Sequence, residues 1–313
     1  MPATRIFRNE QGSATSRRSF RKESWKNSAP NQSIGSSQGQ SELVATTVLY
    51  RPLKILGQNF LANKRIASRV VSAAELTRTD TVLEPGAGYG TLTHLLEDQT
   101  GRVLAVEKDR RLVSHLRKEF ENSPTVSVIE GDVLKIPLPP FNKVVGTPPY
   151  ALSSKLILFL TKKKFELASL VFQKEFGERL LAEPGTAEYG RLSITAQRSL
   201  RIQPIMNIPA AAFRPRPKVD SILLRISPSN AKTSVNEELF EELVRGLFNQ
   251  RRRVVRSSFL HFLSKKVGRE KARTSLESMT LPEKRVFQLT ISDLEELCQQ
   301  LSKALESRGQ SFA

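Results

Sequence analysis

The sequence is poor in side chains that bind metals or form cross-links. It has one cysteine, Cys298, and three scattered histidines, His94, His115 and His261. A single cysteine excludes an intramolecular disulfide and a cysteine-based zinc or iron–sulfur site. No apolar run approaches the ~20 residues of a membrane span, and the first residues lack the apolar stretch of a secretory signal. We therefore expect a soluble protein of a reducing compartment, with no metal and no membrane partner.

Acidic residues are also scarce in this chain of 313 residues. Asp and Glu number 31 against 49 Lys and Arg, which gives a formal net charge of +18. Such a charge exceeds what solubility alone requires, and a strong positive field attracts polyanions, most often nucleic acid. Hydrophobic residues make up 39% of the chain, which is enough for a sizeable core. The composition thus favours a globular protein that acts on or binds nucleic acid.

The first 45 residues differ from the rest of the chain. They are rich in Ser, Gln, Asn, Gly and Arg, and they hold seven basic residues against three acidic ones. A segment so poor in aliphatic residues is expected to be disordered. Three interpretations stay open: a basic arm that touches RNA, an organelle transit peptide, or a tail without a role. A cytoplasmic location is expected, with a mitochondrion or chloroplast as the alternative if this extension is a transit peptide.

From about residue 53 to residue 228 the sequence alternates between short β-rich runs and amphipathic stretches. The expected strands are Thr81–Leu83, Val103–Val106, Val126–Ile129, Lys143–Val145, Leu170–Phe172 and Ser221–Ile226. The expected helices include Lys64–Leu76, Thr91–Leu96, Arg110–Phe120 and Ser154–Leu160. This alternation predicts an α/β fold whose parallel sheet is covered on both faces. Ligands of such sheets bind beyond the carboxyl ends of the strands.

The last part of the chain carries helical patterns alone. After a polar stretch at residues 227–236, Ser234 and Glu237 fit a capping box, which predicts the start of a helix there. Apolar periodicity continues over Val254–Leu263 and Ile291–Leu305. We therefore divide the chain into a basic extension at 1–45, a sheet domain at 46–228 and a small all-helical domain at 229–313, expected to bind RNA.

A glycine-rich turn follows the first of these strands. It runs from Glu84 to Gly90, and Glu107 lies 19 residues after Gly88 at the end of the next strand. Glycines let the backbone approach a ligand closely, and an acid at that distance can accept the hydroxyls of a ribose. The pair occurs in NAD enzymes and in methyltransferases that use S-adenosylmethionine. Thr91 stands where the dinucleotide pattern has its third glycine, and Glu84 suits a cationic ligand, so the methyltransferase interpretation is favoured over a dehydrogenase or a structural turn.

Two further motifs follow the third and fourth strands. Gly131-Asp132-Val133 offers a carboxylate that can accept a hydrogen bond from an adenine amino group, although Gly-Asp is also a common turn. Thr147-Pro148-Pro149-Tyr150 forms a stiff edge at a strand end. The Thr147 hydroxyl and the Pro148 carbonyl can accept the two N–H bonds of an exocyclic amine, while Tyr150 stacks on its base. A protein contributes this kind of orientation and electrostatic stabilisation to the reaction of a cofactor.

Together these motifs resemble the small-subunit ribosomal RNA adenine N6-dimethyltransferases, the kasugamycin-resistance family, which is related to the erythromycin-resistance methylases. The resemblance spans roughly 250 residues from about Lys54. Gly57–Leu61 resembles the opening cofactor motif of the family, and Phe213–Ser221 resembles its late motif. The resemblance implies a Rossmann-like methyltransferase sheet with a small C-terminal helical domain. It also implies direct methyl transfer from S-adenosyl-L-methionine, without a metal, to adjacent adenosines near the 3′ end of small-subunit rRNA.

The resemblance assigns roles by position. The residues expected to contact the cofactor are Gln58, Asn59, Leu61, Gly86, Ala87, Gly88, Glu107, Lys108, Asp132, Val133 and Thr147. Those expected to present the target adenine are Thr147, Pro148, Tyr150 and Phe213, the last on the other side of the base. One departure is Thr147, where the family has Asn. A hydroxyl accepts a hydrogen bond but reaches less far than an amide, so a slower second methylation or a mainly structural role in ribosome assembly stays open.

Basic residues outside these motifs are expected to contact RNA phosphates. Arg214, Arg216 and Lys218 lie beside Phe213 in the sequence. Arg252, Arg253 and Arg256 are expected to share one face of a helix. The expected partner is small-subunit rRNA or the pre-ribosomal small subunit, bound by a monomer. The alternative function is a non-catalytic assembly or transcription factor that binds nucleic acid on the same scaffold.

Overall fold

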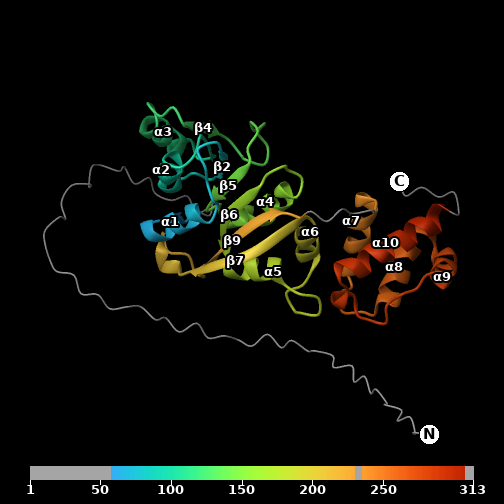
Figure 1. Cartoon of the computed structure of the whole chain (residues 1–313). Coiled ribbons are helices and arrows are strands. Elements are labelled where there is room, and N and C mark those ends of the chain that lie inside the picture. The colour runs from blue at the N-terminus through green and yellow to red at the C-terminus, as the bar shows by residue number, and fades with distance from the viewer. Residues whose placement is uncertain (1–57, 230–234, 307–313) are drawn as a thin grey trace, which may run out of the picture. The chain divides into compact units, whose positions relative to one another are not determined.

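The computed structural model describes residues 58–229 and 235–306, and the Ser234 capping prediction and the basic extension at 1–45 lie outside these residues. A seven-stranded sheet runs through the first part (Figure 1). Its strand order is β4-β3-β2-β5-β6-β9-β7. The strands are β2 (Thr81–Pro85), β3 (Arg102–Glu107), β4 (Val126–Glu130), β5 (Lys143–Gly146), β6 (Leu167–Gln173), β7 (Leu200–Ile208) and β9 (Ser221–Pro228).

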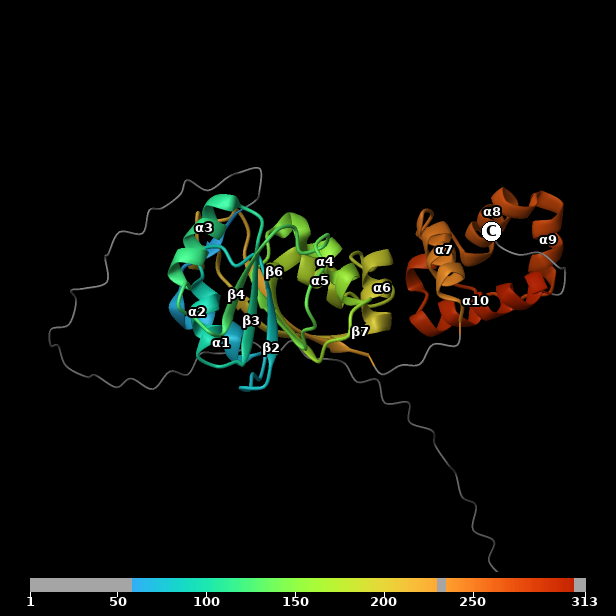
Figure 2. The ribbon, with the colours of Figure 1, turned by 90° about the horizontal axis from the view of Figure 1, so that it is seen from above.

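Helices cover both faces of this sheet, as Figure 2 shows. On one side lie α1 (Lys64–Ser72), α2 (Thr91–Glu97) and α3 (Arg110–Glu119); on the other lie α4 (Ser153–Leu160), α5 (Lys174–Leu181) and α6 (Arg191–Ser199). Neighbouring strand residues belong to opposite layers: Val82 packs with α1–α3, whereas Leu83 packs with α4–α6. Because successive side chains of a strand alternate between faces, a sheet buried on both sides needs continuous apolar runs. The predicted α/β class is confirmed.

The ligand-binding edge of the sheet follows from its connections. The chain builds outward from β2 to β3 and β4, and then returns to place β5 on the other side of β2. The strand order therefore reverses between β2 and β5. Open α/β sheets bind ligands at such a reversal, beyond the carboxyl ends of the strands. The motifs at Glu84–Gly90 and Thr147–Tyr150 flank this point.

The sheet is not wholly parallel, which corrects the prediction. Strands β4, β3, β2, β5 and β6 are parallel, but β9 pairs antiparallel with β6 and β7 pairs antiparallel with β9. The edge strand β7 was not predicted, because Pro204 interrupts its sequence pattern. In the structure its pairing with β9 shifts register between Pro204 and Met206. Proline is tolerated in edge strands. Also unpredicted are the very short β1 (Phe60–Leu61) and β8 (Phe213–Arg214), which pair antiparallel as a separate ribbon.

The helices after residue 235 share one apolar cluster. They are α7 (Glu237–Phe248), α8 (Val255–Val267), α9 (Arg269–Glu277) and α10 (Ile291–Glu306). The N-cap of α7 is Asn236, whose side chain accepts a hydrogen bond from the Leu239 N–H (3.0 Å). The cap seen in the described residues is thus Asn236, at the start of the predicted helix. In the first part, α1 ends at Ser72 rather than at the predicted Leu76, and Glu75 adopts a φ of 49°.

The described residues hold neither a membrane-spanning helix nor a cluster of metal-binding side chains. None of their helices is long and apolar enough to cross a membrane. Nor do residues 58–229 and 235–306 contain a group of three or more His, Cys, Asp or Glu side chains placed to hold a metal ion.

Candidate active site

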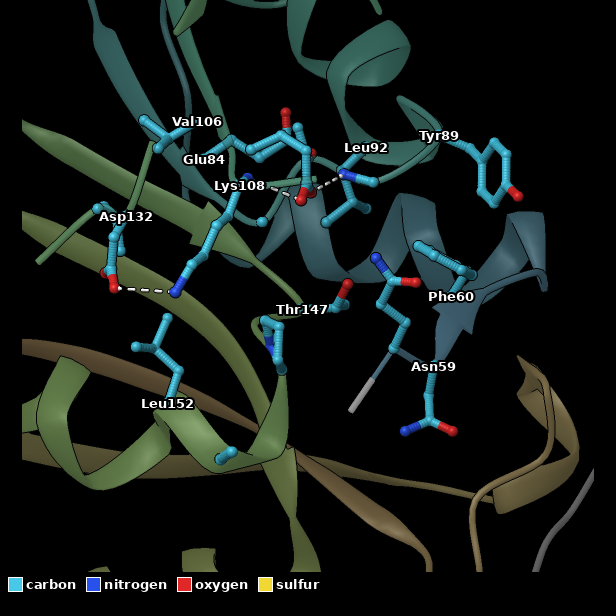
Figure 3. A pocket seen from close by; sticks show the side chains of 18 of the residues that line it. Asn59, Phe60, Glu84, Tyr89, Leu92, Val106, Lys108, Asp132, Thr147 and Leu152 are labelled. Atoms are coloured by element: carbon cyan, nitrogen blue, oxygen red, sulfur yellow. Dashed lines mark hydrogen bonds and ion pairs between the residues drawn. The ribbon is translucent and has the colours of Figure 1, made fainter. Parts of the chain in front are cut away.

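A pocket of about 500 Å³ opens at the carboxyl ends of β2 and β3 (Figure 3). We call it the large pocket. It is lined by every residue that the sequence predicted to contact the cofactor, namely Gln58, Asn59, Leu61, Gly86, Ala87, Gly88, Glu107, Lys108, Asp132, Val133 and Thr147. The structure thus brings together segments from five separate places in the chain. Their individual roles stay predictions.

The glycine loop shapes the floor of the large pocket. Gly86 and Gly88 have φ angles of 78° and 62°, a region that residues with a β-carbon rarely adopt. A β-carbon at Gly88 would also lie 3.0 Å from the Phe60 ring, and one at Gly86 would lie 3.2 Å from Pro149. The positive φ angles therefore favour glycine at both positions, and a β-carbon would also be tightly packed there.

Glu107 holds this loop against the end of β3. One carboxylate oxygen accepts a hydrogen bond from the Gly88 N–H (2.9 Å), and the other accepts from the N–H groups of Lys108 (2.8 Å) and Asp109 (2.9 Å). The side chain is buried. Each carboxylate oxygen has further lone-pair capacity, so Glu107 can still accept from ligand hydroxyls. The same group therefore fixes the pocket wall and lines the pocket.

Glu84 is the second carboxyl of the pocket. It is 2% exposed, and the Thr93 hydroxyl donates to it at 2.7 Å. Burial, assisted by the nearby Glu107 charge, raises the pKa of Glu84 to about 8. The carboxyl is thus largely protonated at neutral pH, because the charged form loses its hydration in the interior. A cation in the pocket would favour the ionised form.

Two polar pairs cross the rim of the large pocket. Lys108 and Asp132 extend toward one another in Figure 3, with 3.5 Å between Nζ and Oδ2. On the β1 side, the Gln58 amide donates to Asp109 Oδ2 (3.1 Å), and Arg111 donates to both Asp109 oxygens. Hydrogen bonding from Arg111 lowers the pKa of Asp109 to about 2. The Gln58 contact ties the predicted opening motif to the start of α3.

A much smaller cavity, of about 10 Å³, lies next to the large pocket. We call it the small cavity. Its lining includes all four residues predicted to present the target base, Thr147, Pro148, Tyr150 and Phe213. Thr147, Pro149 and Asn59 line both spaces. The large pocket and the small cavity therefore meet at these three residues, and the meeting of cofactor and target amine there stays a prediction.

The small cavity is narrow because aromatic side chains pack around it. Phe213 is 1% exposed, and it lies opposite Leu61 in the β1–β8 ribbon. The Tyr150 hydroxyl is 2.8 Å from the Ser221 hydroxyl, and burial raises the pKa of Tyr150. A space of about 10 Å³ cannot hold a purine. A base can lie between Tyr150 and Phe213 only after these side chains move.

The predicted RNA contacts divide into two sets. Arg214, Arg216 and Lys218 are exposed, and they follow Phe213 directly. The prediction that Arg252, Arg253 and Arg256 share a helical face is wrong, because α8 begins at Val255. Arg252 and Arg253 lie in the turn before it, where the Val255 N–H donates to the Lys284 carbonyl (2.9 Å). All three arginines are nevertheless exposed.

Several residues that line the large pocket were not predicted. They are Phe60, Tyr89, Leu92, Val106, Leu134 and Leu152. The Phe60 and Tyr89 rings meet edge to face with centroids 4.6 Å apart. Both lie inside the quoted motifs, so their positions carried a signal. Leu152 follows Tyr150 in a short 3₁₀ turn, η2 (Tyr150–Leu152), and had no such signal.

The chain is similar in sequence to known proteins. A family model described as ribosomal RNA adenine dimethylase matches residues 53–297. The chain is 42% identical over 257 residues to a probable ribosomal RNA small subunit methyltransferase A of Thermococcus kodakarensis, covering 80% of this chain and 91% of that protein. It is 37% identical over 254 residues to the protein of the same name from Pyrococcus furiosus, covering 79% and 91%.

Two solved structures are similar to the chain. One is a dimethyladenosine transferase from Plasmodium falciparum, with a TM-score of 0.70, 30% identity, and coverage of 78% of this chain and 98% of that one. The other is the 23S rRNA methyltransferase ErmE, with a TM-score of 0.58, 26% identity, and coverage of 78% and 100%. The first is named as a dimethyladenosine transferase and the second as an rRNA methyltransferase, and the sequence motifs favoured a methyltransferase over a dehydrogenase.

Proposed function

Because the chain belongs to the ribosomal RNA adenine dimethylase family, we propose that it transfers methyl groups from S-adenosyl-L-methionine to N6 of adenosine. The proposed target is a pair of adjacent adenosines near the 3′ end of small-subunit rRNA, modified during ribosome biogenesis. The observation that carries the proposal is the junction at Thr147 and Pro149, which line both the large pocket and the small cavity. A methyl donor in the large pocket and an acceptor amine in the small cavity can meet at this junction.

The residues of the large pocket fit the proposed cofactor. Its volume, about 500 Å³, is within the usual range for small-molecule sites. Glu107 offers carboxylate oxygens to a ribose, and Asp132 offers one to an adenine amino group. Glu84 lies buried where a cationic ligand would favour its ionised form. When bound, S-adenosyl-L-methionine supplies an electrophilic methyl carbon.

Residues of the small cavity would orient the target amine. We propose that the Thr147 hydroxyl and the Pro148 carbonyl accept the two N6–H bonds, which directs the nitrogen lone pair toward the large pocket. Tyr150 and Phe213 would hold the base between their rings, as expected for an unstacked base. The two prolines keep this edge stiff, and small misplacements at such a point are costly. The threonine reaches less far than an amide, so we propose that the second methylation is the slower one.

The test is mass-spectrometric mapping of methylated adenosines after incubation of the purified protein with S-adenosyl-L-methionine and small-subunit rRNA. We expect N6-monomethylated and then N6,N6-dimethylated adenosine at adjacent positions. The matched control is the same RNA with those adenosines replaced by guanosine, which should stay unmodified. Absence of methyl transfer while the cofactor demonstrably binds would contradict the proposal and favour a non-catalytic role.

We also propose a partner, an oligomeric state and a location for the protein. The partner would be small-subunit rRNA or its precursor particle, bound by a monomer without a metal. We propose a cytoplasmic location, on the ground that the relatives are named for rRNA methylation. Fractionation of cells that express the full chain, compared with a chain lacking residues 1–45, separates this from import into an organelle.

A further inference from the structure

Helix α1 presents a cationic face that no sequence motif had indicated. Lys64, Arg65 and Arg69 are exposed, whereas Ala67, Val70 and Val71 are buried against the sheet. Residues 64, 65 and 69 fall on one side of a helix by its periodicity of 3.6 residues per turn. Residues 62–74 contain no Asp or Glu. We call Lys64, Arg65 and Arg69 the α1 basic face.

These cations are not engaged by neighbouring acids. Within residues 58–229 and 235–306, none of the three forms an ion pair. Glu75, the acid that follows α1 in the sequence, is paired with Arg225 at 2.6 Å. An exposed cation without a partner keeps its full charge available for a ligand, whereas a paired one must first give up its partner.

The residues between the cations leave room for a ligand. Ser68 and Ser72 are exposed on the same side of the helix. Their hydroxyls donate back to the carbonyls of Lys64 (3.1 Å) and Ser68 (2.8 Å). These short side chains bond back to the helix backbone, so the longer cations extend beyond them into solvent. Lys64 and Arg69 are about 7.5 Å apart along the axis, which lets them contact different phosphates of one strand.

The start of helix α1 lies next to the segment that carries Phe213, one of the residues lining the small cavity. Strand β1 leads directly into α1 and pairs with β8, which carries Phe213 and Arg214. The N–H groups of Ala62 and Asn63 both donate to the Ala212 carbonyl, at 2.9 and 3.3 Å. Figure 1 shows α1 beside the segment that contains β8. The exposed Arg214 and Arg216 thus belong to the segment that pairs with the chain just before α1.

We propose that the α1 basic face binds phosphates of the RNA strand that flanks the target adenosine, and so delivers the base to the small cavity. This inference rests on the proposed function. RNA is the occupant that fits, because the surface is cationic, lacks acidic residues and begins next to the segment that carries Phe213. Phosphate contacts position a nucleic acid without reading its sequence.

The experiment compares two triple variants of equal charge change. K64Q/R65Q/R69Q removes the α1 basic face. K162Q/K163Q/K164Q removes three exposed lysines from the turn before β6, at the amino end of the strands and thus at the opposite edge from the site. The probe is a synthetic RNA hairpin with two adjacent adenosines in its loop. Its affinity is measured by fluorescence anisotropy over a series of salt concentrations, beside the affinity for S-adenosyl-L-methionine.

We expect the α1 variant to lose RNA affinity by on the order of ten-fold or more at moderate salt, with a salt slope smaller by about 2. The control variant should stay within about two-fold of wild type. Cofactor affinity should be unchanged in both. In methyl transfer, the α1 variant should show a raised KM for RNA with kcat retained. The single variant Arg69→Gln should lower the salt slope by about 0.7 to 0.9, which guards against a folding defect in the triple variant.

Equal RNA affinity in the α1 and control variants would overturn the inference, whether both are unchanged or both weakened. A lowered kcat with unchanged KM would also overturn it. The proposed function fails separately, through the absence of methyl transfer by the wild type. In that case the binding comparison still decides whether α1 holds RNA.

Discussion

The large pocket and the small cavity share Thr147 and Pro149, yet they differ in how completely they are formed. The large pocket measures about 500 Å³, whereas the small cavity measures about 10 Å³. The wall of the first is fixed by backbone N–H groups that donate to the Glu107 carboxylate. The second is filled by side chains, above all by Phe213. We infer that the cofactor enters a preformed site, while RNA has to open its own.

This difference has a physical basis in the two kinds of wall. Backbone groups held by a buried carboxylate move little, because an unmade hydrogen bond in the interior costs about 1–3 kcal/mol. A packed ring can change rotamer if a ligand replaces its contacts. An adenine between Tyr150 and Phe213 would replace those contacts by stacking, which is worth about 1–3 kcal/mol per base. The target cavity can therefore be closed without RNA and open with it.

Glu107→Ala should separate the two sites most sharply. It removes the acceptor for three backbone N–H groups and for the proposed ribose hydroxyls. Bonds to a charged acceptor contribute about 1.5–3 kcal/mol each, so cofactor affinity should fall by about 100-fold or more. Titration calorimetry with S-adenosyl-L-methionine measures it, and RNA affinity serves as the internal control. A parallel loss of RNA affinity would mean that the two sites are not independent.

Thr147→Ala should act on the other side of the junction. Loss of one hydrogen bond to the target amine, at about 1–1.5 kcal/mol, should slow methyl transfer about ten-fold with cofactor affinity nearly unchanged. Thr147→Ser keeps the hydroxyl and is the matched control. Single-turnover kinetics with the RNA hairpin provide the rate. If the Ala and Ser variants are equally fast, the hydroxyl does not hold the amine.

Glu84→Gln tests the electrostatics of the large pocket. In the wild type, burial raises the pKa of Glu84 to about 8, and a cationic ligand favours its ionised form. Wild-type affinity for S-adenosyl-L-methionine should therefore rise relative to the variant as pH increases toward 8, by up to about ten-fold per pH unit. Binding measured at several pH values in both proteins gives the difference. A constant ratio across this range would show that Glu84 does not sense the ligand.

The raised pKa of Glu84 should also make the free energy of unfolding depend on pH. The folded protein holds the Glu84 proton more tightly than the unfolded chain, in which the pKa of this carboxyl is 4.5. The free energy of unfolding of the wild type should therefore fall, relative to Glu84→Gln, as pH rises from about 4.5 to about 8. Denaturant unfolding of both proteins over this range is the check.

Lys108→Met should have the smallest effect. The Lys108–Asp132 pair spans 3.5 Å with Lys108 largely exposed, and such pairs contribute about 0–1 kcal/mol. Freeing Asp132 for the cofactor should change cofactor affinity by no more than about three-fold, in the direction of tighter binding. Calorimetry at low and high salt measures this change in cofactor affinity. A loss of affinity greater than ten-fold would give Lys108 a direct contact with the ligand.

The sequence predicted the large pocket well because its motifs follow strands. Glu107, Asp132 and Thr147 each come just after an apolar run, and the carboxyl ends of parallel strands meet at one edge of a sheet. That rule needs no knowledge of long-range packing. The buried strands β2, β3, β5 and β6 were predicted in part because strands covered on both faces are nearly continuously apolar.

The errors arise where distant segments decide the structure. The pattern at residues 251–256 contains no Gly or Pro to end a helix, yet the chain turns there because Val254 and Val255 pair with Lys284 and Arg285. The burial of Phe213 likewise depends on its pairing with β1, a strand of two residues. Neither contact leaves a local signal. The α1 basic face was missed because single charges on a helix are usual, and its meaning depends on the neighbouring β8.

The most direct test of the account is the structure of the protein with the RNA hairpin and S-adenosylhomocysteine, read as the distance from the target adenosine N6 to Thr147 Oγ1. We expect a hydrogen-bond distance of about 2.7–3.2 Å, with the base between Tyr150 and a displaced Phe213 ring. An adenosine bound elsewhere, with Phe213 still buried beside Leu61, would contradict it.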